Sequence, residues 1–249
     1  MSDAPVALLT MSGGYVGPAV ARKLAAGGHR LVLHRPDPAV VAELEADGAE
    51  VLALGEPHHD LATAEGNQAV VDAAIARFGR LDAACLVTGH ITVGPFLEAS
   101  VEEWERVKRA NLDEVFHGLR AVLPPMLQEG RGQVVVFTSA TGAKQQPRVS
   151  LYGSTRAGAN ALVQAVALEH AASGVTVNAI GTNFMDFPGF LGASGADRDP
   201  ARRERILSQV PVRRLGTMEE LAEFTVVLLD GRTRFQTGQF FSFSGGWSA

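Results

Sequence analysis

The chain has 249 residues, a formal net charge of −5 and hydrophobic side chains at 46% of its positions. This size fits one α/β domain or a small two-domain protein, and the hydrophobic share is sufficient for a large buried core. The acidic balance, with no basic run, argues against nucleic acid or a membrane surface as a partner. No signal segment or membrane-spanning apolar run is present, so we expect a cytoplasmic protein.

Short apolar strand patterns alternate with longer helical patterns. In chain order we predict a strand at 6–9, a helix at 18–26, a strand at 30–34, a helix at 38–46, a strand at 50–54, a helix at 67–78, a strand at 81–87, a helix at 101–123, a strand at 133–138, a helix at 151–172, a strand at 175–180, a helix at 218–229 and a strand at 239–243. Apolar strands that alternate with helices indicate a parallel sheet covered on both faces. We therefore predict an α/β, Rossmann-like doubly wound parallel sheet of about seven strands, as a single domain over residues 1–249.

The segment at 181–203 has no clear period and contains three phenylalanines. Long loops inside compact domains are usually functional or disordered, and the aromatic residues argue against disorder. We interpret this segment as a lid or wall on the substrate side. Packing against a neighbouring subunit is the alternative.

The predicted strand that ends at Ser139 leads through a loop into a helix that carries Tyr152 and Arg156. Tyr152 and Arg156 are four residues apart, so they share one face of that helix. Ligands of parallel sheets bind at the carboxyl ends of the strands, where Ser139 lies. A nearby cation favours the deprotonated form of a phenol, and arginine does not release its proton. We therefore expect Tyr152 to act as a base beside Arg156, with Ser139 orienting the substrate oxygen.

The first predicted strand and helix are joined by the stretch Thr10-Met11-Ser12-Gly13-Gly14-Tyr15-Val16-Gly17. A dinucleotide-binding fold carries glycines here, so that the backbone can approach a pyrophosphate. Met11 and Tyr15 stand where two of these glycines are expected, and a phenol ring would fill the volume of the phosphates. A shifted register that uses Gly13 and Gly14 is the alternative.

Arg35, Cys85 and the pair His58-His59 are further candidates for binding a ligand or a metal. Arg35, after the second predicted strand, could bind a 2′-phosphate and leaves an NADP-binding site open, although a solvated arginine explains it equally well. Cys85 lies in an apolar strand pattern and is interpreted as a buried core residue. His58-His59 has no cluster of carboxylates and histidines around it, so we expect a solvated loop and no metal site.

The chain resembles the short-chain dehydrogenases/reductases and, within that fold, the halohydrin dehalogenases. One dehalogenase motif, T-x4-[F/Y]-x-G, matches at Thr10, Tyr15 and Gly17. The second motif, S-x12-Y-x3-R, matches at Ser139, Tyr152 and Arg156. The stretch 178–184 is similar to the halide-site loop of that family, and the region 214–247 is similar to its C-terminal part. The resemblance covers essentially the whole chain.

This resemblance implies a cofactor-independent halohydrin dehalogenase, which is a carbon–halide lyase. Tyr152 would take the hydroxyl proton of a vicinal haloalcohol while Ser139 holds the oxygen, and the alkoxide would expel the halide to give an epoxide. In the reverse direction, azide, cyanide or nitrite would open epoxides. The implied ligands are a haloalcohol or epoxide and a halide or other small anion, with no nucleotide and no metal.

The resemblance also places the binding residues. A nest of backbone amides with an aromatic wall is expected to hold the halide, and its residues are Tyr15, Thr182, Asn183, Phe184 and Met185. For Phe184 and Met185, core packing is the alternative. The residues assigned to the substrate pocket by loop position are Ile91, Phe96, Gln146, Val149, Phe187 and Phe190. The two long predicted helices are similar to the paired-helix interfaces of tetramers of this fold, which implies a homotetramer.

Two alternative functions remain at this stage. The first is an NADP-dependent short-chain reductase in which Arg156 stands where such enzymes typically carry a lysine. Arg35 favours it, and so does Asn111, because reductases of this fold carry an asparagine of their proton relay there. The second is a catalytically silent member of the fold that serves as an assembly or binding subunit.

Overall fold

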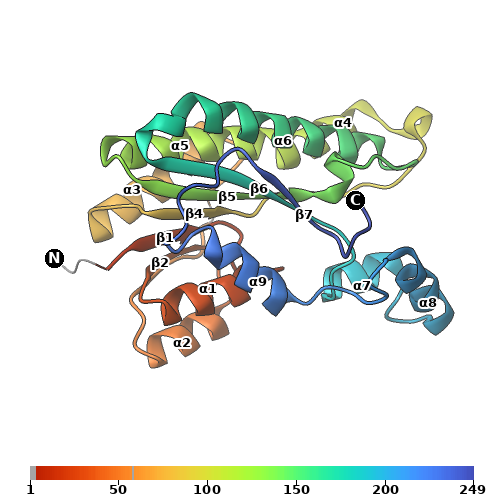
Figure 1. Cartoon of the computed structure of the whole chain (residues 1–249), viewed down its shortest axis with the longest axis horizontal. Helices are drawn as coiled ribbons and strands as arrows, with labels where there is room; N and C mark the ends of the chain where they lie inside the picture. Colours follow the sequence, from red (N-terminus) through yellow and green to blue (C-terminus); the bar gives the residue numbers. More distant parts are fainter. Residues whose placement is uncertain (1–3, 58) are drawn as a thin grey trace.

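The computed structural model describes residues 4–57 and 59–249. Within these residues, seven strands form one parallel sheet in the order β3-β2-β1-β4-β5-β6-β7 (Figure 1). The strands are β1 (Val6–Leu9), β2 (Arg30–His34), β3 (Val51–Leu54), β4 (Ala83–Leu86), β5 (Gly132–Ser139), β6 (Val175–Thr182) and β7 (Phe240–Phe243). The predicted Rossmann-like, doubly wound parallel sheet is confirmed.

Helices cover both faces of this sheet (Figure 1). One face carries α1 (Gly17–Ala26), α2 (Pro38–Ala46) and α9 (Met218–Val227), and the other carries α3 (Ala64–Phe78), α5 (Glu114–Gln128) and α6 (Ser150–His170). Successive strand residues enter opposite cores, because side chains alternate across a strand. Leu8 and Val134 pack under α3, α5 and α6, whereas their neighbours Leu9 and Val135 pack under α1, α2 and α9.

The helix predicted at 101–123 is interrupted. It consists of α4 (Val101–Lys108), a π turn at Arg109–Asp113, and then α5. The side chain of Asn111 is buried at this turn, and its amide donates to the carbonyl oxygens of Val107, at 2.9 Å, and His90, at 2.8 Å. An amide that bonds to the backbone competes with regular helical hydrogen bonding, which accounts for the irregular turn.

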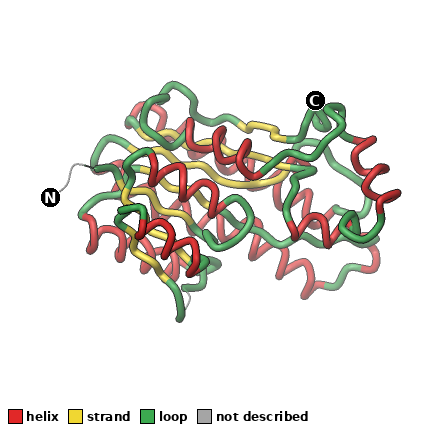
Figure 2. The backbone as a smooth tube through the Cα atoms, turned by 90° about the horizontal axis from the view of Figure 1, so that it is seen from below, coloured by secondary structure: helices red, strands yellow, loops and turns green. Residues whose placement is uncertain are grey.

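The segment at 181–203 was predicted as an irregular loop, and this is wrong in part. It contains α7 (Pro188–Ser194) and the start of α8 (Pro200–Gln209), which lie at the end of the molecule away from the N-terminus (Figures 1 and 2). Asp199 caps α8 by accepting hydrogen bonds from the backbone of Ala201, at 2.9 Å, and Arg202, at 3.1 Å. No residue of α8 is fully buried, and its apolar contact is limited to the partly buried Ile206 and Leu207, so the helix has no long apolar stripe that a periodic pattern could show.

Two observations concern membranes and metals. Across residues 4–57 and 59–249, no helix is both long and apolar enough to cross a membrane. The same residues contain no group of three or more His, Cys, Asp or Glu side chains that could hold a metal ion. His58, one half of the histidine pair noted in the sequence, lies outside the described residues. Cys85 is buried in β4, and burial raises the pKa of its thiol to about 12, as fits an inert core residue.

Candidate active site

Ser139 is the last residue of β5, at the carboxyl edge of the sheet, and its side chain is buried. Its hydroxyl lies 2.8 Å from the hydroxyl of Thr141, accepts a hydrogen bond from the backbone N–H of Thr141 at 3.2 Å, and donates to the carbonyl of Thr182 at 3.4 Å. The serine is therefore held by the turn that follows β5 and by the end of β6.

Tyr152 and Arg156 lie in the first two turns of α6. The guanidinium carbon of Arg156 is 5.4 Å from the centre of the Tyr152 ring, within cation–π distance. The loop between β5 and α6 lies directly on this helix. A Cβ atom at Gly153 would be 2.3 Å from the side-chain oxygen of Gln145, and one at Gly142 would be 2.9 Å from the backbone of Arg156. Glycine at both positions allows the strand end that carries Ser139 to approach α6 closely.

Arg156 is 3% exposed and is fixed by the ends of two strands. One terminal nitrogen donates to the carbonyl of Thr88 at 2.5 Å, and the other donates to the hydroxyl of Thr88 at 3.2 Å and to the carbonyl of Phe137 at 3.3 Å. Its Nε has no hydrogen-bond partner among the described residues. The planar guanidinium thus acts as a fixed cation beside Tyr152, because arginine stays protonated in proteins.

Gly89 makes room for this guanidinium. It has a φ of +128°, and a Cβ atom there would lie 1.7 Å from a terminal nitrogen of Arg156. The next residue, His90, donates its backbone N–H to the side chain of Asn111 at 3.1 Å. Asn111 therefore ties the bend between α4 and α5 to the loop after β4. The contacts of Thr88 and Gly89 with Arg156 were not predicted from the sequence, since Arg156 is remote from both along the chain.

Glu114 is a titratable group near this site that the sequence analysis did not identify. Burial raises the pKa of its carboxyl to about 7, while the nearby Arg156 acts in the opposite direction. Asp60, Arg109 and Arg35 also contribute to its electrostatic environment. The site therefore contains an acid that changes charge near neutral pH.

Tyr15 and Thr182, both predicted for the halide site, are brought together. Their hydroxyl oxygens are 2.6 Å apart. The Tyr15 ring makes edge contacts with Phe137, at 5.9 Å, and Phe187, at 4.9 Å between ring centres. Burial raises the pKa of Tyr15 well above its ordinary value, so the phenol is neutral.

The rest of the predicted halide loop is arranged differently. Phe184 packs against Phe190 and Trp247 in a separate cluster, and Met185 belongs to the core under α1, α2 and α9. The backbone N–H of Phe184 donates to the side chain of Asn183 at 2.9 Å, and that of Asn183 donates to Phe243 at 3.3 Å. These two amides are thus hydrogen-bonded within the protein, and Phe184 has a φ of +57°. Asn183, Phe184 and Met185 line a second cavity together with residues of 210–220 and 242–245.

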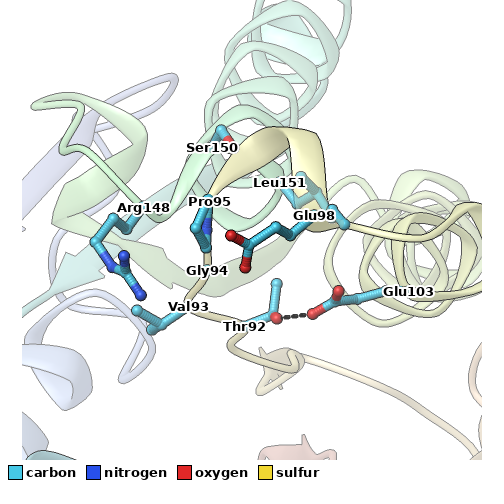
Figure 3. Close-up of a pocket in the computed structure, with 10 residues that line it drawn as sticks. Thr92, Val93, Gly94, Pro95, Glu98, Glu103, Arg148, Ser150 and Leu151 are labelled. Carbon is cyan, nitrogen blue, oxygen red and sulfur yellow. Dashed lines mark hydrogen bonds between the residues drawn. The ribbon is translucent and has the colours of Figure 1, made fainter.

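A cavity of about 150 Å³ opens beside the start of α6 (Figure 3). The loop after β4 and the end of the loop before α6 enclose it, and its lining residues are Thr92, Val93, Gly94, Pro95, Glu98, Ala99, Glu103, Arg148, Ser150 and Leu151. Glu98 and Arg148 are charged, and Thr92 donates to Glu103.

None of the six residues predicted for the substrate pocket lines this cavity. Ile91 and Phe96 are 56% and 67% exposed, while Phe187 and Phe190 pack on Tyr15 and Phe184. Gln146 and Val149 flank Arg148 but are absent from the cavity wall. Loop position does not show which residues of an irregular loop line a cavity.

Folds of this type bind a nicotinamide dinucleotide where the strand order reverses. That point lies between β1 and β4. At the adenosine end, Arg35 is exposed after β2 and is a suitable partner for a 2′-phosphate. At the other end, a ring that reaches Tyr152 would need the volume crossed by Tyr15 on its way to Thr182. The residues therefore fit the adenosine end, and they do not fit the nicotinamide end while Tyr15 lies as it does.

Comparison with known proteins gives consistent matches over nearly the whole chain. Residues 14–248 match the family model described as enoyl-(acyl carrier protein) reductase. The 4-formylbenzenesulfonate dehydrogenase TsaC1/TsaC2 of Comamonas testosteroni is 31% identical, with 97% of this chain and 96% of the relative covered. The D-beta-hydroxybutyrate dehydrogenase of Rhizobium meliloti is also 31% identical, with 98% of both chains covered.

Two solved structures are similar to this chain over nearly its whole length. The crystal structure of levodione reductase superposes with a TM-score of 0.89 at 27% identity, and the match covers 98% of this chain and 97% of the other. A putative gluconate dehydrogenase from Agrobacterium tumefaciens has a TM-score of 0.87 at 26% identity, with 98% of this chain and 96% of the other covered.

These matches overturn the predicted enzyme class. The relatives are dehydrogenases and reductases, so the expectation of a carbon–halide lyase that works without a cofactor, a halohydrin dehalogenase, is wrong. That expectation rested on two short motifs and on the similarity of two stretches, 178–184 and 214–247, whereas the matches to dehydrogenases and reductases extend over nearly the whole chain. A family model that spans residues 14–248 and relatives that are 31% identical over nearly their full length place this chain in the short-chain dehydrogenase/reductase family.

Proposed function

We propose that the chain is an oxidoreductase that acts on a small alcohol or carbonyl compound. The observation that carries this proposal is the placement of Ser139 at the end of β5 and of Tyr152 beside Arg156 in the first turns of α6. The names of two relatives describe dehydrogenases of a hydroxy acid and of a formyl compound, which supports the same class of substrate.

Each residue of the site has a distinct role in this proposal. The hydroxyl of Ser139 lies beside Thr141 and Thr182, and it turns its single proton from the carbonyl of Thr182 to the substrate oxygen. Tyr152 exchanges a proton with the same oxygen, as a general acid or base. Arg156 keeps a permanent positive charge over the Tyr152 ring, and its strand-end hydrogen bonds hold it there.

Oxidation of the alcohol also needs a hydride acceptor, which a nicotinamide dinucleotide would supply. Arg35 favours a nucleotide with a 2′-phosphate, because a guanidinium pairs well with phosphate oxygens. Ser139, Tyr152 and Arg156 only transfer the proton and position the substrate oxygen. The cavity beside Leu151, with Glu98 and Arg148 in its wall, offers polar contacts to the remainder of a small substrate.

Turnover assays test the proposal directly. The purified chain is mixed with NADPH or NADH and a panel of small ketones and aldehydes, and in the opposite direction with NADP⁺ or NAD⁺ and the corresponding alcohols. We expect a change in nicotinamide absorbance with at least one pair, and a preference for the 2′-phosphorylated nucleotide. No turnover with any pair, by a protein whose circular dichroism shows it to be folded, would refute the proposal.

A further inference from the structure

The Tyr15 side chain connects two distant parts of the chain. Tyr15 lies in the loop after β1 and Thr182 is the last residue of β6, yet their hydroxyls are 2.6 Å apart. Strands β4 and β5 lie between β1 and β6 in the sheet. The pair, called the Tyr15–Thr182 bridge below, therefore crosses the carboxyl ends of two strands. It lies near enough to Tyr152 and Arg156 for both to influence the pKa of Tyr15.

The bridge is well held but has no ionic contact. Phe137 and Phe187 contact the Tyr15 ring edge-on from two different elements. The hydrogen bond joins two neutral hydroxyls, because burial keeps the Tyr15 phenol protonated. Neutral hydrogen bonds are weaker than those of charged groups, so a ligand that needs this volume can displace the ring.

The backbone of the loop keeps the shape that a glycine-rich loop would have. Met11 and Tyr15 have φ values of +47° and +50°, in the left-handed region that glycine adopts freely and other residues rarely occupy. Only their side chains differ from glycine, and these point to different ends of the site. The sulfur of Met11 lies 3.9 Å from the guanidinium of Arg35, whereas Tyr15 reaches Thr182.

We propose that the Tyr15–Thr182 bridge competes with the nicotinamide half of a dinucleotide for the same volume and thereby sets the affinity for that cofactor. The adenosine half binds beside Arg35 whether the bridge is closed or open, and the nicotinamide half enters only when the bridge opens. This inference rests on the proposed use of a nicotinamide dinucleotide. It adds that Tyr15 and Thr182 are the residues that limit its binding.

Binding measurements separate the two halves of the ligand. Isothermal titration calorimetry is carried out with 2′,5′-ADP, which lacks the nicotinamide, and with NADPH, on wild type, Tyr15→Gly, Tyr15→Phe and Thr182→Val. The quantity compared is the Kd of 2′,5′-ADP divided by the Kd of NADPH. Met11→Gly is the matched control, because it relieves the same backbone conformation in the same loop without touching the bridge. Thermal unfolding of each variant checks that the fold is intact.

We expect a ratio near one in the wild type and in Met11→Gly, and an increase of about tenfold or more in Tyr15→Gly. Tyr15→Phe and Thr182→Val keep the shape of the bridge but lose its hydrogen bond, so their ratios should rise by a smaller amount. A ratio in Tyr15→Gly equal to that of the wild type would overturn the inference. So would the failure of both ligands to bind any variant.

These outcomes are independent of turnover. If the ratio rises in Tyr15→Gly while no substrate is oxidised or reduced, the proposed function fails and the role of the bridge stands. If substrates are turned over but the ratio does not change, the proposed function stands and the role of the bridge is rejected.

Discussion

The guanidinium of Arg156 donates a 2.5 Å hydrogen bond to the carbonyl oxygen of Thr88, and thereby links α6 to the chain that leaves β4. The two residues are 68 positions apart in the sequence. The contact fixes the cation whose charge lies over the Tyr152 ring, and it depends on a glycine at position 89, next to Thr88.

Gly89→Ala should therefore displace Arg156. The added Cβ would lie 1.7 Å from its terminal nitrogen, at a φ of +128° that alanine rarely adopts. We expect a loss of roughly 1–3 kcal/mol in the free energy of unfolding and about a 100-fold lower kcat. Gly192→Ala in α7 is the control, because a Cβ there meets no atom within 4 Å and the residue does not line the cavity. Equal kcat values for the two variants would contradict this account.

Tyr152→Phe should lower kcat by about 100- to 10,000-fold, because it removes the group that exchanges a proton with the substrate. Ser139→Ala should lower kcat by about 100-fold through the loss of one positioned donor. Steady-state kinetics with the substrate pair found in the turnover screen provide the measurement. Ser154→Ala, an exposed position on the same helix, should retain wild-type kinetics. A Tyr152→Phe variant with most of its activity would show that another residue transfers the proton.

Glu114 should make stability depend on pH. Burial raises the pKa of its carboxyl from an ordinary 4.5 to about 7, so the folded chain holds this proton more tightly than the unfolded chain does. Stability therefore falls as the pH rises from 4.5 through 7, because the unfolded carboxylate is ionised first. Glu114→Gln removes this dependence.

Denaturant unfolding at pH 5 and pH 8 measures the Glu114 effect. The stability of Glu114→Gln relative to wild type should increase by about 1–3 kcal/mol between the two values. Glu45→Gln, an exposed position on α2, should show no such change. The prediction is refuted if Glu114→Gln follows the wild type at both pH values.

The expected homotetramer stays a prediction, and the surface of α4 and α5 allows a test. Trp104 and Phe116 are 38% and 43% exposed on these two helices, which is typical of apolar residues that a partner subunit covers. Light scattering after size exclusion should give four times the mass of the chain, and Phe116→Glu should give a smaller assembly. Ala39→Glu, on the opposite face of the sheet, should leave the mass unchanged. A monomeric wild type would reject the tetramer.

The local pattern of apolar and polar residues was sufficient to predict most of the strands and helices. Strands β1 and β2 have the predicted bounds, and α2 lies between Asp37 and Asp47 as predicted. The alternation of these elements indicated a doubly wound parallel sheet, because few topologies bury apolar strands on both faces. The spacing of Tyr152 and Arg156 also predicted that they share a helix face, and the two side chains do lie within cation–π distance.

The tertiary structure decided the contacts between residues far apart in the chain. Tyr15 meets Thr182 across 167 positions, and Arg156 meets Thr88 across 68. Neither contact has a periodic signal, because it depends on the order of strands in the sheet and on glycines that leave space. The enzyme class likewise could not be read from short motifs, since a few matching residues do not separate enzymes that share one fold over the whole chain. Sequence periodicity predicts which face of a helix or strand is buried, and only the tertiary structure shows which side chains are in contact at the edge of the sheet.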